Sequence, residues 1–375
     1  MLEVIFFILI AIILYVYIGY PLILQLLSSF GKTIEKENIF PIVTLFIPAH
    51  NEAEVIRQKI ENSLNLDYPR KKLEIIVASD GSTDGTGDIV REYAEIGVLF
   101  FESKKRGGKN SLINRYINNA TGEIIIFTDA NSFYKEAAIK KLVINFNDKS
   151  VGCVVGNLKY IDKKTSVGKG EGLYFRYESM IKMLESRHGT LVAATGSIYA
   201  IRKSLFTPLD MDVANDLAHP IQIAASGYKV VFEPEAVVYE KATSSPAEEF
   251  KRRARIVTRG LTAFLRYRKK YRMIRGMWGF CFVSHKLIRW FVPFLLIALF
   301  LTNLFLYSSF FKFTLYGQIG FYGAALAGAF FKEKTGKVFS IPFYFCLINF
   351  AALMGIIKYF KGAREAVWEV AKTTR

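Results

Sequence analysis

The residues best suited to chemistry follow a run of β-branched and aromatic residues at Ile124–Thr128. Asp129 and Asn131 come directly after that run and are separated by one small residue, Ala130. A carboxylate and a neutral amide oxygen suit a hard divalent cation such as Mg²⁺ or Mn²⁺, which is commonly shared with substrate phosphates. The alternative is a cap for a helix at 135–145, and these residues alone leave both interpretations open.

Two glycine-containing stretches could bind a nucleotide or its phosphates. In "SDGSTDGT" (79–86), the glycines permit tight turns with free backbone N–H groups, and Asp80 could accept from a base or a ribose hydroxyl. In "KKRGGKN" (104–110), a phosphate could bind at the N-terminus of the following helix, beside Lys109. The first stretch could also be a surface turn, and the second lacks the spacing of a Walker loop.

Asp216 is a candidate for proton transfer. It follows Asn215 at the start of a helical pattern. A carboxylate there could act as a general base, but an acid in the first turn of a helix also interacts favourably with the helix dipole. Position alone favours the second role.

The elements that must position these side chains alternate between strands and helices. Apolar runs predict strands at 41–48, 72–79, 98–103 and 123–129, with helices at 52–66, 84–96 and 109–119. Such alternation indicates a mostly parallel sheet with helices on both faces. Ligands of such sheets bind beyond the carboxyl ends of the strands, so we expect the polar clusters that follow three of these strands to form one site.

Taken together, these stretches resemble the inverting family 2 glycosyltransferases, which have the nucleotide-sugar-binding GT-A fold. The resemblance covers roughly residues 41–270, and its motifs occur in the order that the family shows. They are "PAHNE" (48–52), "SDGSTDGT", "RGGKNSLIN" (106–114), "TDAN" (128–131), "TGSIYAIRK" (195–203), "NDL" (215–217) and "GYKVVFEPEA" (227–236). The closing stretches "SHKLIRW" (284–290) and "VWEVAKTTR" (367–375) look like those of membrane-bound polysaccharide-synthase relatives.

The resemblance implies a role for each matched position. Asp129 and Asn131 would bind the metal and the diphosphate, and Asp216 would be the catalytic base. The nucleotide-sugar would also contact a further set of residues: Pro48, Ala49, His50, Glu52, Asp80 and Lys109. The implied reaction is a single displacement that inverts the anomeric carbon.

Two positions depart from the family pattern. Asn131 stands where the family has a second metal aspartate, which removes one negative charge. Processive synthases carry Gln-x-x-Arg-Trp, and the nearest match here, 252–256, keeps the arginine and lacks the tryptophan. Arg252 and Arg255 are three residues apart on one face of an expected interfacial helix, where they could bind the diphosphate.

Four uncharged runs approach the ~20 residues that a helix needs to span a bilayer. They are Val4–Leu27, Trp290–Phe311, Phe313–Phe331 and Val338–Ile357, and they fit a mean hydropathy of +0.23. The first run is too long for the core of a signal peptide and lacks a basic start, so we expect a retained anchor. Gln318 and four glycines in the third run argue against a simple span.

The net charge of +17 is concentrated between Lys251 and Arg275, which contains 11 lysines and arginines and no acid. This stretch precedes a membrane run, which places the globular part on the cytoplasmic side and indicates contact with anionic lipids. Three scattered cysteines fit a reducing compartment. Nucleic-acid binding is not expected, because no nucleic-acid motif accompanies the basic stretch. Three spans after the domain would put the tail outside, whereas the tail's own basic residues favour the inside.

We therefore expect five parts: a membrane helix at 1–30, a GT-A domain at 38–244, basic interfacial helices at 245–289, membrane helices at 290–360 and a basic tail at 361–375. The expected function is transfer from a nucleotide-sugar, with UDP-sugars favoured, to a polysaccharide or lipid-linked glycan at the cytoplasmic face of the cell membrane. Polyprenyl phosphate as the direct acceptor and a non-catalytic nucleotide-binding subunit are the alternatives. The sequence leaves the sugar, processivity and oligomeric state open.

Overall fold

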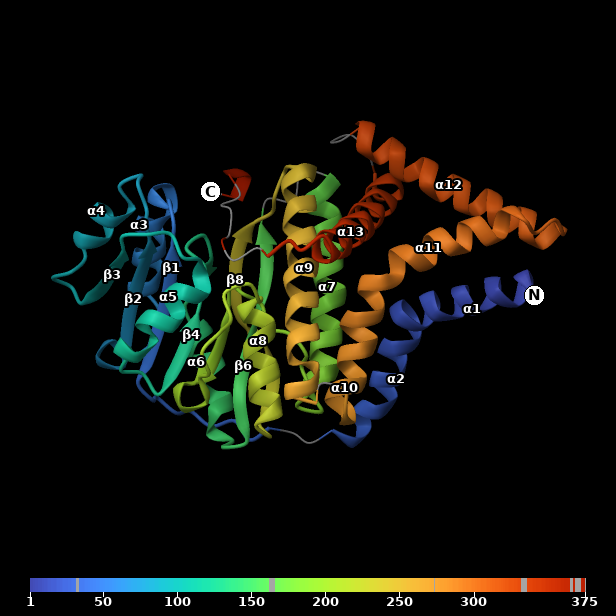
Figure 1. The fold of residues 1–375 in the computed structure, drawn as a ribbon. Coiled ribbons are helices and arrows are strands. Elements are labelled where there is room, and N and C mark those ends of the chain that lie inside the picture. The colour runs from blue at the N-terminus through green and yellow to red at the C-terminus, as the bar shows by residue number, and fades with distance from the viewer. Residues whose placement is uncertain are drawn as a thin grey trace.

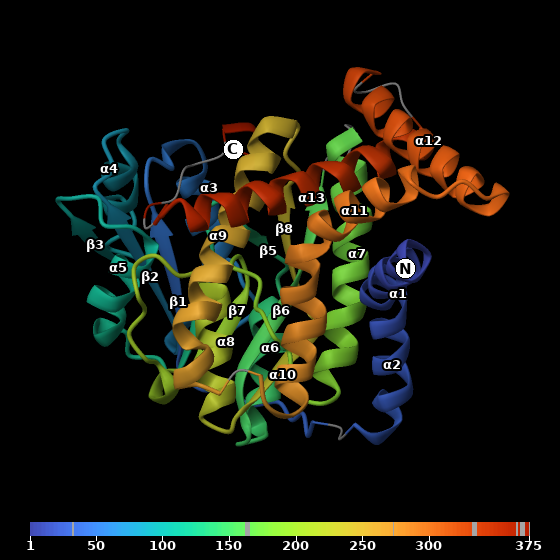
Figure 2. The same ribbon diagram turned by 45° about the vertical axis from the view of Figure 1, so that its right-hand side comes forward.

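The computed structural model describes residues 1–31, 34–161, 166–272, 274–331, 336–364, 367 and 372–374. Its centre is an eight-stranded sheet of order β3-β2-β1-β4-β7-β6-β8-β5. In Figures 1 and 2 this sheet forms one side of the molecule, and long helices at the other side continue into a group of protruding helices. The globular part and these helices are in direct contact.

The first half of the sheet has the parallel architecture that the apolar runs predict. β1 (Val43–Ala49) pairs in parallel with β2 (Leu73–Asp80) and with β4 (Ile124–Phe127), and β2 pairs in parallel with β3 (Val98–Ser103). The four predicted strands are therefore confirmed. The chain order reverses between β1 and β4, and a ligand crevice is expected at such a reversal.

The second half of the sheet is mixed. β7 (Tyr199–Arg202) is antiparallel to both β4 and β6 (Val151–Ile161), while β8 (Lys229–Lys241) is parallel to β6. The short β5 (Phe133–Tyr134) pairs antiparallel with β8. The sequence patterns above did not identify β6, β7 and β8 as strands, although β7 and β8 overlap motifs of the family resemblance.

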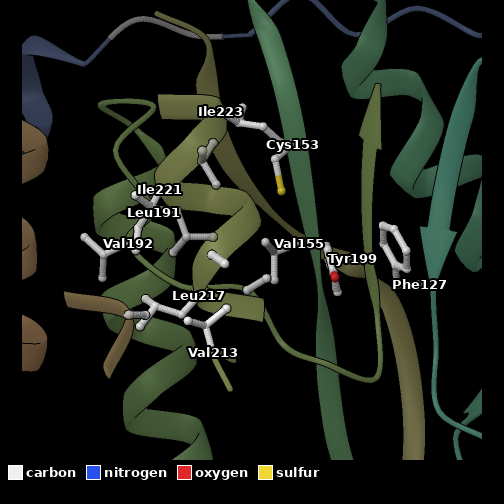
Figure 3. Packing of buried hydrophobic residues seen from close by; sticks show 14 of the residues in the cluster. Phe127, Cys153, Val155, Leu191, Val192, Tyr199, Val213, Leu217, Ile221 and Ile223 are labelled. Atoms are coloured by element: carbon white, nitrogen blue, oxygen red, sulfur yellow. The ribbon is translucent and has the colours of Figure 1, made fainter. Parts of the chain in front are cut away.

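Helices cover both faces of the sheet. One face packs against α3 (Ala53–Leu64) and α6 (Ala138–Val143). The other packs against α5 (Lys109–Tyr116), α7 (Ser166–Ser186) and α8 (Asn215–Ala225), and Figure 3 shows α8 side chains packed on Cys153 and Val155 of β6. Alternate β1 residues enter the two cores, as the two-residue period of a strand requires. A further short helix of the globular part, α4, spans Thr86–Arg91.

The basic stretch forms one long helix, α9 (Pro246–Lys270). Its start has the expected chemistry, because the Ser245 hydroxyl accepts from the Glu248 N–H and proline occupies the first turn. Val257, Leu261 and Phe264 enter the same core as α8, together with residues of the protruding helices. This shared core fixes the globular part to those helices.

Within the part of the chain that the structure describes, three helical segments are long and apolar enough to cross a membrane: Leu2–Leu27, Gly276–Leu304 and Lys337–Phe360. They correspond to α1 (Leu2–Leu14) with α2 (Tyr20–Leu27), α10 (Gly276–Phe282) with α11 (Ile288–Leu304), and α13 (Lys337–Phe360). In the first two, a π-helical turn joins the helices, at Tyr15–Gly19 and at Val283–Leu287. The run at 313–331 lies in α12 (Ser309–Phe331), which falls outside this set.

The described end of the chain, Lys372–Thr374, lies against the globular part. The Thr373 hydroxyl donates to Glu248 Oε2 at 2.5 Å, and Thr374 Oγ1 is 3.5 Å from Asn131 Nδ2. Much of the expected basic tail, including Arg375, lies outside the described residues. Its described end is therefore on the same side as the domain.

Candidate active site

A cavity of about 430 Å³ begins beyond the carboxyl ends of β1 and β4 and continues between α7, α9, α11 and α13. Its two ends differ in origin. We call one the sheet end, formed by Pro48, Glu52, Lys109, Asp129, Asn131 and Asp216. We call the other the membrane end, formed by Tyr17, Glu178, Lys182, His285, Lys286 and Arg289. The cavity thus joins strand-end residues to helices that can cross a membrane.

Asp129 and Asn131 line the sheet end, as the spacing after β4 predicts. The Lys109 ammonium donates to Asp129 Oδ1 at 2.6 Å, and the Asp129 side chain is still 40% exposed. A partly exposed ion pair contributes little to stability, so both side chains can exchange this contact for one with a ligand at a small cost in free energy. Lys109 is therefore available to bind a phosphate directly, and Asp129 is available to bind one through a cation.

Asp80 and His50 lie behind the cavity and do not line it. Asp80 is fully buried, and its two carboxylate oxygens accept from the N–H groups of Gly107 and Gly108 at 2.7 and 2.8 Å. His50 Nδ1 is 2.8 Å from the Asp80 carbonyl oxygen. Gly108 has a φ of +90°, which favours glycine. In this arrangement Asp80 holds the turn that starts α5 and thereby places Lys109.

The other residues of the stretch 48–52 that the resemblance assigns to the nucleotide-sugar also differ in whether they line the cavity. Pro48 and Glu52 line the cavity, whereas Ala49 is the last residue of β1 and is buried in the core. The Glu52 N–H donates to the Thr86 hydroxyl at 2.9 Å. This bond ties the end of β1 to the start of α4.

Asp216 enters the sheet end from the first turn of α8. A Cβ atom added to Gly196 would lie 3.6 Å from Asp216 Oδ2 and 3.8 Å from Asp129 Oδ2. The two carboxylates therefore face a common space that glycine leaves open. Burial raises the pKa of Asp216, and Asp129 adds to this effect, while Lys109 and Arg259 act in the opposite direction. A carboxylate with a raised pKa is a better proton acceptor.

A buried polar network supports the start of α8, and sequence reasoning missed it. Asn215 Nδ2 donates to the Tyr199 hydroxyl at 2.7 Å, so that hydroxyl keeps its own proton for His219 Nδ1, 2.9 Å away. Burial lowers the pKa of His219 to about 3, which keeps the ring neutral. The network fixes the helix turn that carries Asp216.

Arg252 and Arg255 of α9 both line the cavity, as their spacing predicts. Buried Glu249 orients Arg252, whose Nε donates to Glu249 Oε2 at 2.8 Å. Burial acts to raise the pKa of Glu249, but Arg252 and Arg253 outweigh it and lower that pKa to about 2. Glu249 therefore stays ionised and holds the arginines in place.

Sequence reasoning also missed three charged residues around the site. Arg259 lines the cavity and donates to the carbonyl of Val213, just before α8. The sequence signal that could have identified Arg259 was its position seven residues after Arg252, on the same face of the helix. Glu240 lines the cavity, and its pKa is raised by burial and by Asp129. Fully buried Lys59 donates to Thr128 Oγ1 at 2.9 Å, on the strand side of Asp129.

The sheet end fits a divalent cation that substrate phosphates help to bind. Asp129 offers one carboxylate and Asn131 one neutral oxygen at the cavity. Among the described residues, no group of three His, Cys, Asp or Glu side chains forms a ready cage. Mg²⁺ and Mn²⁺ are commonly held in this way, by one or two protein oxygens completed by phosphates. The donor set therefore matches the Mg²⁺ or Mn²⁺ that the sequence predicts.

Residues 44–207 match the family model described as glycosyl transferase family 2. The chain is 31% identical over 281 residues to the probable glycosyltransferase YdaM of Bacillus subtilis strain 168, covering 68% of this chain and 66% of that protein. It is 27% identical over 234 residues to the poly-beta-1,6-N-acetyl-D-glucosamine synthase of Staphylococcus aureus strain COL, covering 60% and 56%. The matches thus span less than two thirds of these relatives.

One solved structure resembles almost the whole chain. The mannosyltransferase PcManGT from Pyrobaculum calidifontis, in complex with GDP-Man and Mn²⁺, superposes with a TM-score of 0.73 at 23% identity. The match covers 96% of this chain and 99% of that one. This similarity confirms the GT-A fold that the sequence predicts.

Proposed function

We propose that this chain, which carries a glycosyl transferase family 2 domain, moves a sugar from a nucleotide-sugar to a glycan acceptor at a membrane. The observation that carries the proposal is the single cavity in which Asp129 and Asp216 face the space beside Gly196. Lys109, Arg252 and Arg255 line the same cavity. One donor molecule can therefore meet a candidate base and several phosphate-binding groups at once.

The donor's diphosphate would bind at the sheet end. Lys109 would leave Asp129 and turn to a phosphate, and Arg252 and Arg255 would approach from α9. Asp80 would act through the Gly107–Gly108 turn and not through direct contact with the base. A UDP-sugar is the proposed donor, in keeping with the polymer that the Staphylococcus relative's name describes, although PcManGT was solved with GDP-Man.

The proposed reaction is a single displacement. Asp216 takes the proton of an acceptor hydroxyl while that oxygen bonds to the anomeric carbon of the donor. The bond from that carbon to the diphosphate oxygen breaks, and the nucleoside diphosphate leaves with the electron pair. Because attack and departure take place on opposite sides, the anomeric carbon inverts. Lys109, Arg252 and Arg255 stabilise the charge on the departing diphosphate.

Asp129 and Asn131 would hold Mg²⁺ or Mn²⁺ together with the diphosphate. When bound, the cation supplies positive charge to the leaving group. The proposal draws support from the donor set at the sheet end and from the Mn²⁺ in the PcManGT complex.

We place the catalytic domain at the cytoplasmic face of the cell membrane. The basic helix α9 directly precedes the candidate span Gly276–Leu304, which fits the positive-inside rule. Two candidate spans after the domain would return the chain to the side of the membrane on which the domain lies. The contact of Thr373 with Glu248 supports this arrangement. Membrane lipids and a glycan or lipid-linked acceptor are then the expected partners.

A second acceptor chemistry has support at the membrane end, where several cations line the cavity. If a polyprenyl phosphate oxygen attacked directly, no proton would have to be removed. Asp216→Asn would then lower turnover only modestly. A hydroxyl acceptor predicts a large loss for the same variant.

The proposal can be tested with detergent-purified protein and a panel of UDP-, GDP- and dTDP-sugars, with Mn²⁺ or Mg²⁺. We expect release of one nucleoside diphosphate and a labelled product whose size separates single transfer from polymerisation. Absence of release with every donor and membrane extract, from protein that still binds nucleotide, would instead favour a non-catalytic subunit.

A further inference from the structure

The membrane end of the cavity gathers basic side chains from two distant parts of the chain. Lys182 comes from α7, while Lys286 and Arg289 come from the π-helical turn and the start of α11. All three line the cavity. These three cations belong to other elements than the sheet-end cations, and Lys286 and Arg289 lie within the candidate membrane span Gly276–Leu304.

Glu178 arranges two of these cations without neutralising the group. Its carboxylate accepts from Arg289 at 2.5 Å and from Lys286 at 3.3 Å. His285, which is 1% exposed, faces both Glu178 and Glu185, the latter at 2.7 Å. Two of the three cations, Lys286 and Arg289, therefore share the one carboxylate of Glu178, while His285 also faces Glu185. The membrane end keeps a surplus of positive charge.

Of these three cations, Lys182 gives the strongest indication of an anionic ligand. It is 8% exposed, and its ammonium donates to Thr195 Oγ1 at 2.5 Å. No carboxylate of the described residues forms an ion pair with it. Burial lowers its pKa to about 8, with a further contribution from Lys286, while Asp216 and Glu178 oppose the shift. Burying a cation without an anion is costly, so the site is suited to an anionic ligand.

A second cavity of about 360 Å³ lies between α1, α11, α12 and α13, next to the membrane end. Its lining is apolar apart from Thr314, Gln318 and Tyr322, and includes Phe6, Ile10, Leu296, Leu299, Phe321 and Phe345. The rings of Phe345 and Tyr17 are 5.7 Å apart, and Tyr17 lines the main cavity. A charged cavity and an apolar one thus share a wall among helices that protrude together (Figures 1 and 2).

We propose that the membrane end binds the phosphate of a lipid-linked acceptor through Lys182, Lys286 and Arg289, while the adjoining apolar cavity takes its hydrocarbon chain. This inference rests on the proposed function, because it assumes that the sheet end is occupied by the donor. Lys182 donates to Thr195, and the adjacent Gly196 faces Asp216, so a phosphate at Lys182 places the attached acceptor group near the candidate base. A free phosphate would use the same cations but gain nothing from the apolar cavity.

The test is a binding titration without donor or turnover, so its failure is distinct from failure of the proposed transfer. Full-length protein in phosphatidylcholine nanodiscs is titrated with geranylgeranyl phosphate, geranylgeraniol and inorganic phosphate, followed by tryptophan fluorescence, because Trp290 lines the cavity. We expect the isoprenoid phosphate to bind at least about tenfold more tightly than either the alcohol or inorganic phosphate.

Lys182→Gln should weaken isoprenoid phosphate binding by roughly tenfold or more, because it removes a charge-assisted contact. Lys286→Gln, whose side chain is 19% exposed, is the second variant should Lys182→Gln fail to fold. Lys141→Gln, an exposed lysine paired with Glu235, is the matched control and should bind as wild type. Equal affinity for alcohol and phosphate, equal affinity for inorganic and isoprenoid phosphate, or unaltered binding by folded Lys182 and Lys286 variants would overturn the proposal.

Discussion

The two ends of the cavity hold charged groups in different ways. At the sheet end, Asp129 is 40% exposed and pairs with Lys109, a contact that ligand binding can replace. At the membrane end, Glu178 is buried and accepts from Arg289 and Lys286 beside His285. The first arrangement is suited to charges that change partners when a donor binds and leaves. The second holds its cations in place before any ligand arrives.

Asp216, where the two ends meet, should produce the largest effect. With a hydroxyl acceptor, Asp216→Asn should lower turnover by about 10²- to 10⁴-fold, because that is the usual contribution of a general base. The rate of nucleoside diphosphate release under saturating donor measures it. Asp88→Asn, at an 83% exposed side chain on α4, should leave the rate unchanged. A loss of only a few-fold for Asp216→Asn would favour a phosphate oxygen as the nucleophile.

The stability of paired variants sharpens the contrast between the ends. Glu178→Gln should lower the free energy of unfolding by about 3–5 kcal/mol, because it leaves buried cations uncompensated. Asp129→Asn should lower it by less than about 1 kcal/mol, since its ion pair is partly exposed. Unfolding of both proteins in the same detergent gives the comparison. Equal losses would refute the distinction drawn between the two ends.

The network that supports the first turn of α8 should matter less for turnover than Asp216, and less for stability than Glu178. Tyr199→Phe removes the hydroxyl that accepts from Asn215 and donates to His219, leaving buried polar atoms without that partner. We expect a loss of about 1–3 kcal/mol in the free energy of unfolding. Turnover should fall with little change in the KM for the donor, as a positioning role requires. A rise in donor KM at unchanged turnover would assign Tyr199 to donor binding instead.

The pH dependence should give the smallest effect. Burial raises the pKa of Asp216, and the base acts only when deprotonated. Turnover should therefore be constant above that raised pKa and fall as the pH drops through it. The acid limb of a turnover–pH profile should lie above the ordinary aspartate value of about 3.9. A profile that stays flat down to that value would contradict the role of Asp216 as base.

The sheet end was predictable because consecutive strands bring their carboxyl ends to one edge. Short apolar runs located β1 and β4, and the polar residues after them located Glu52 and Asp129. The glycine-containing stretch 104–110 located Lys109. Position after a strand could not distinguish a residue that lines the cavity from one that supports a neighbouring turn. Asp80 follows β2 as Asp129 follows β4, yet its carboxylate is buried under the Gly107–Gly108 turn.

The membrane end was not predictable in this way, because it joins residues that are distant in sequence. Tyr17, Lys182 and Arg289 meet only after the π-helical turn Tyr15–Gly19, α7 and α11 have packed together. One local signal did exist: Glu178, Lys182 and Glu185 recur at helical spacing within α7. Charges on one face of a helix more often mark a solvated surface, and the sequence contains nothing that places this face inside.

The central claim is that strand-end residues bind the donor's phosphates through a cation, and a nucleotide titration of Asp129→Ala tests it most directly. UDP and GDP are titrated into wild type, Asp129→Ala and the exposed control Asp88→Ala, in Mn²⁺ and in EDTA. We predict that wild type and the control bind more tightly in Mn²⁺, and that Asp129→Ala loses this gain by about 10- to 100-fold. Mn²⁺-dependent affinity that survives in Asp129→Ala would contradict the account.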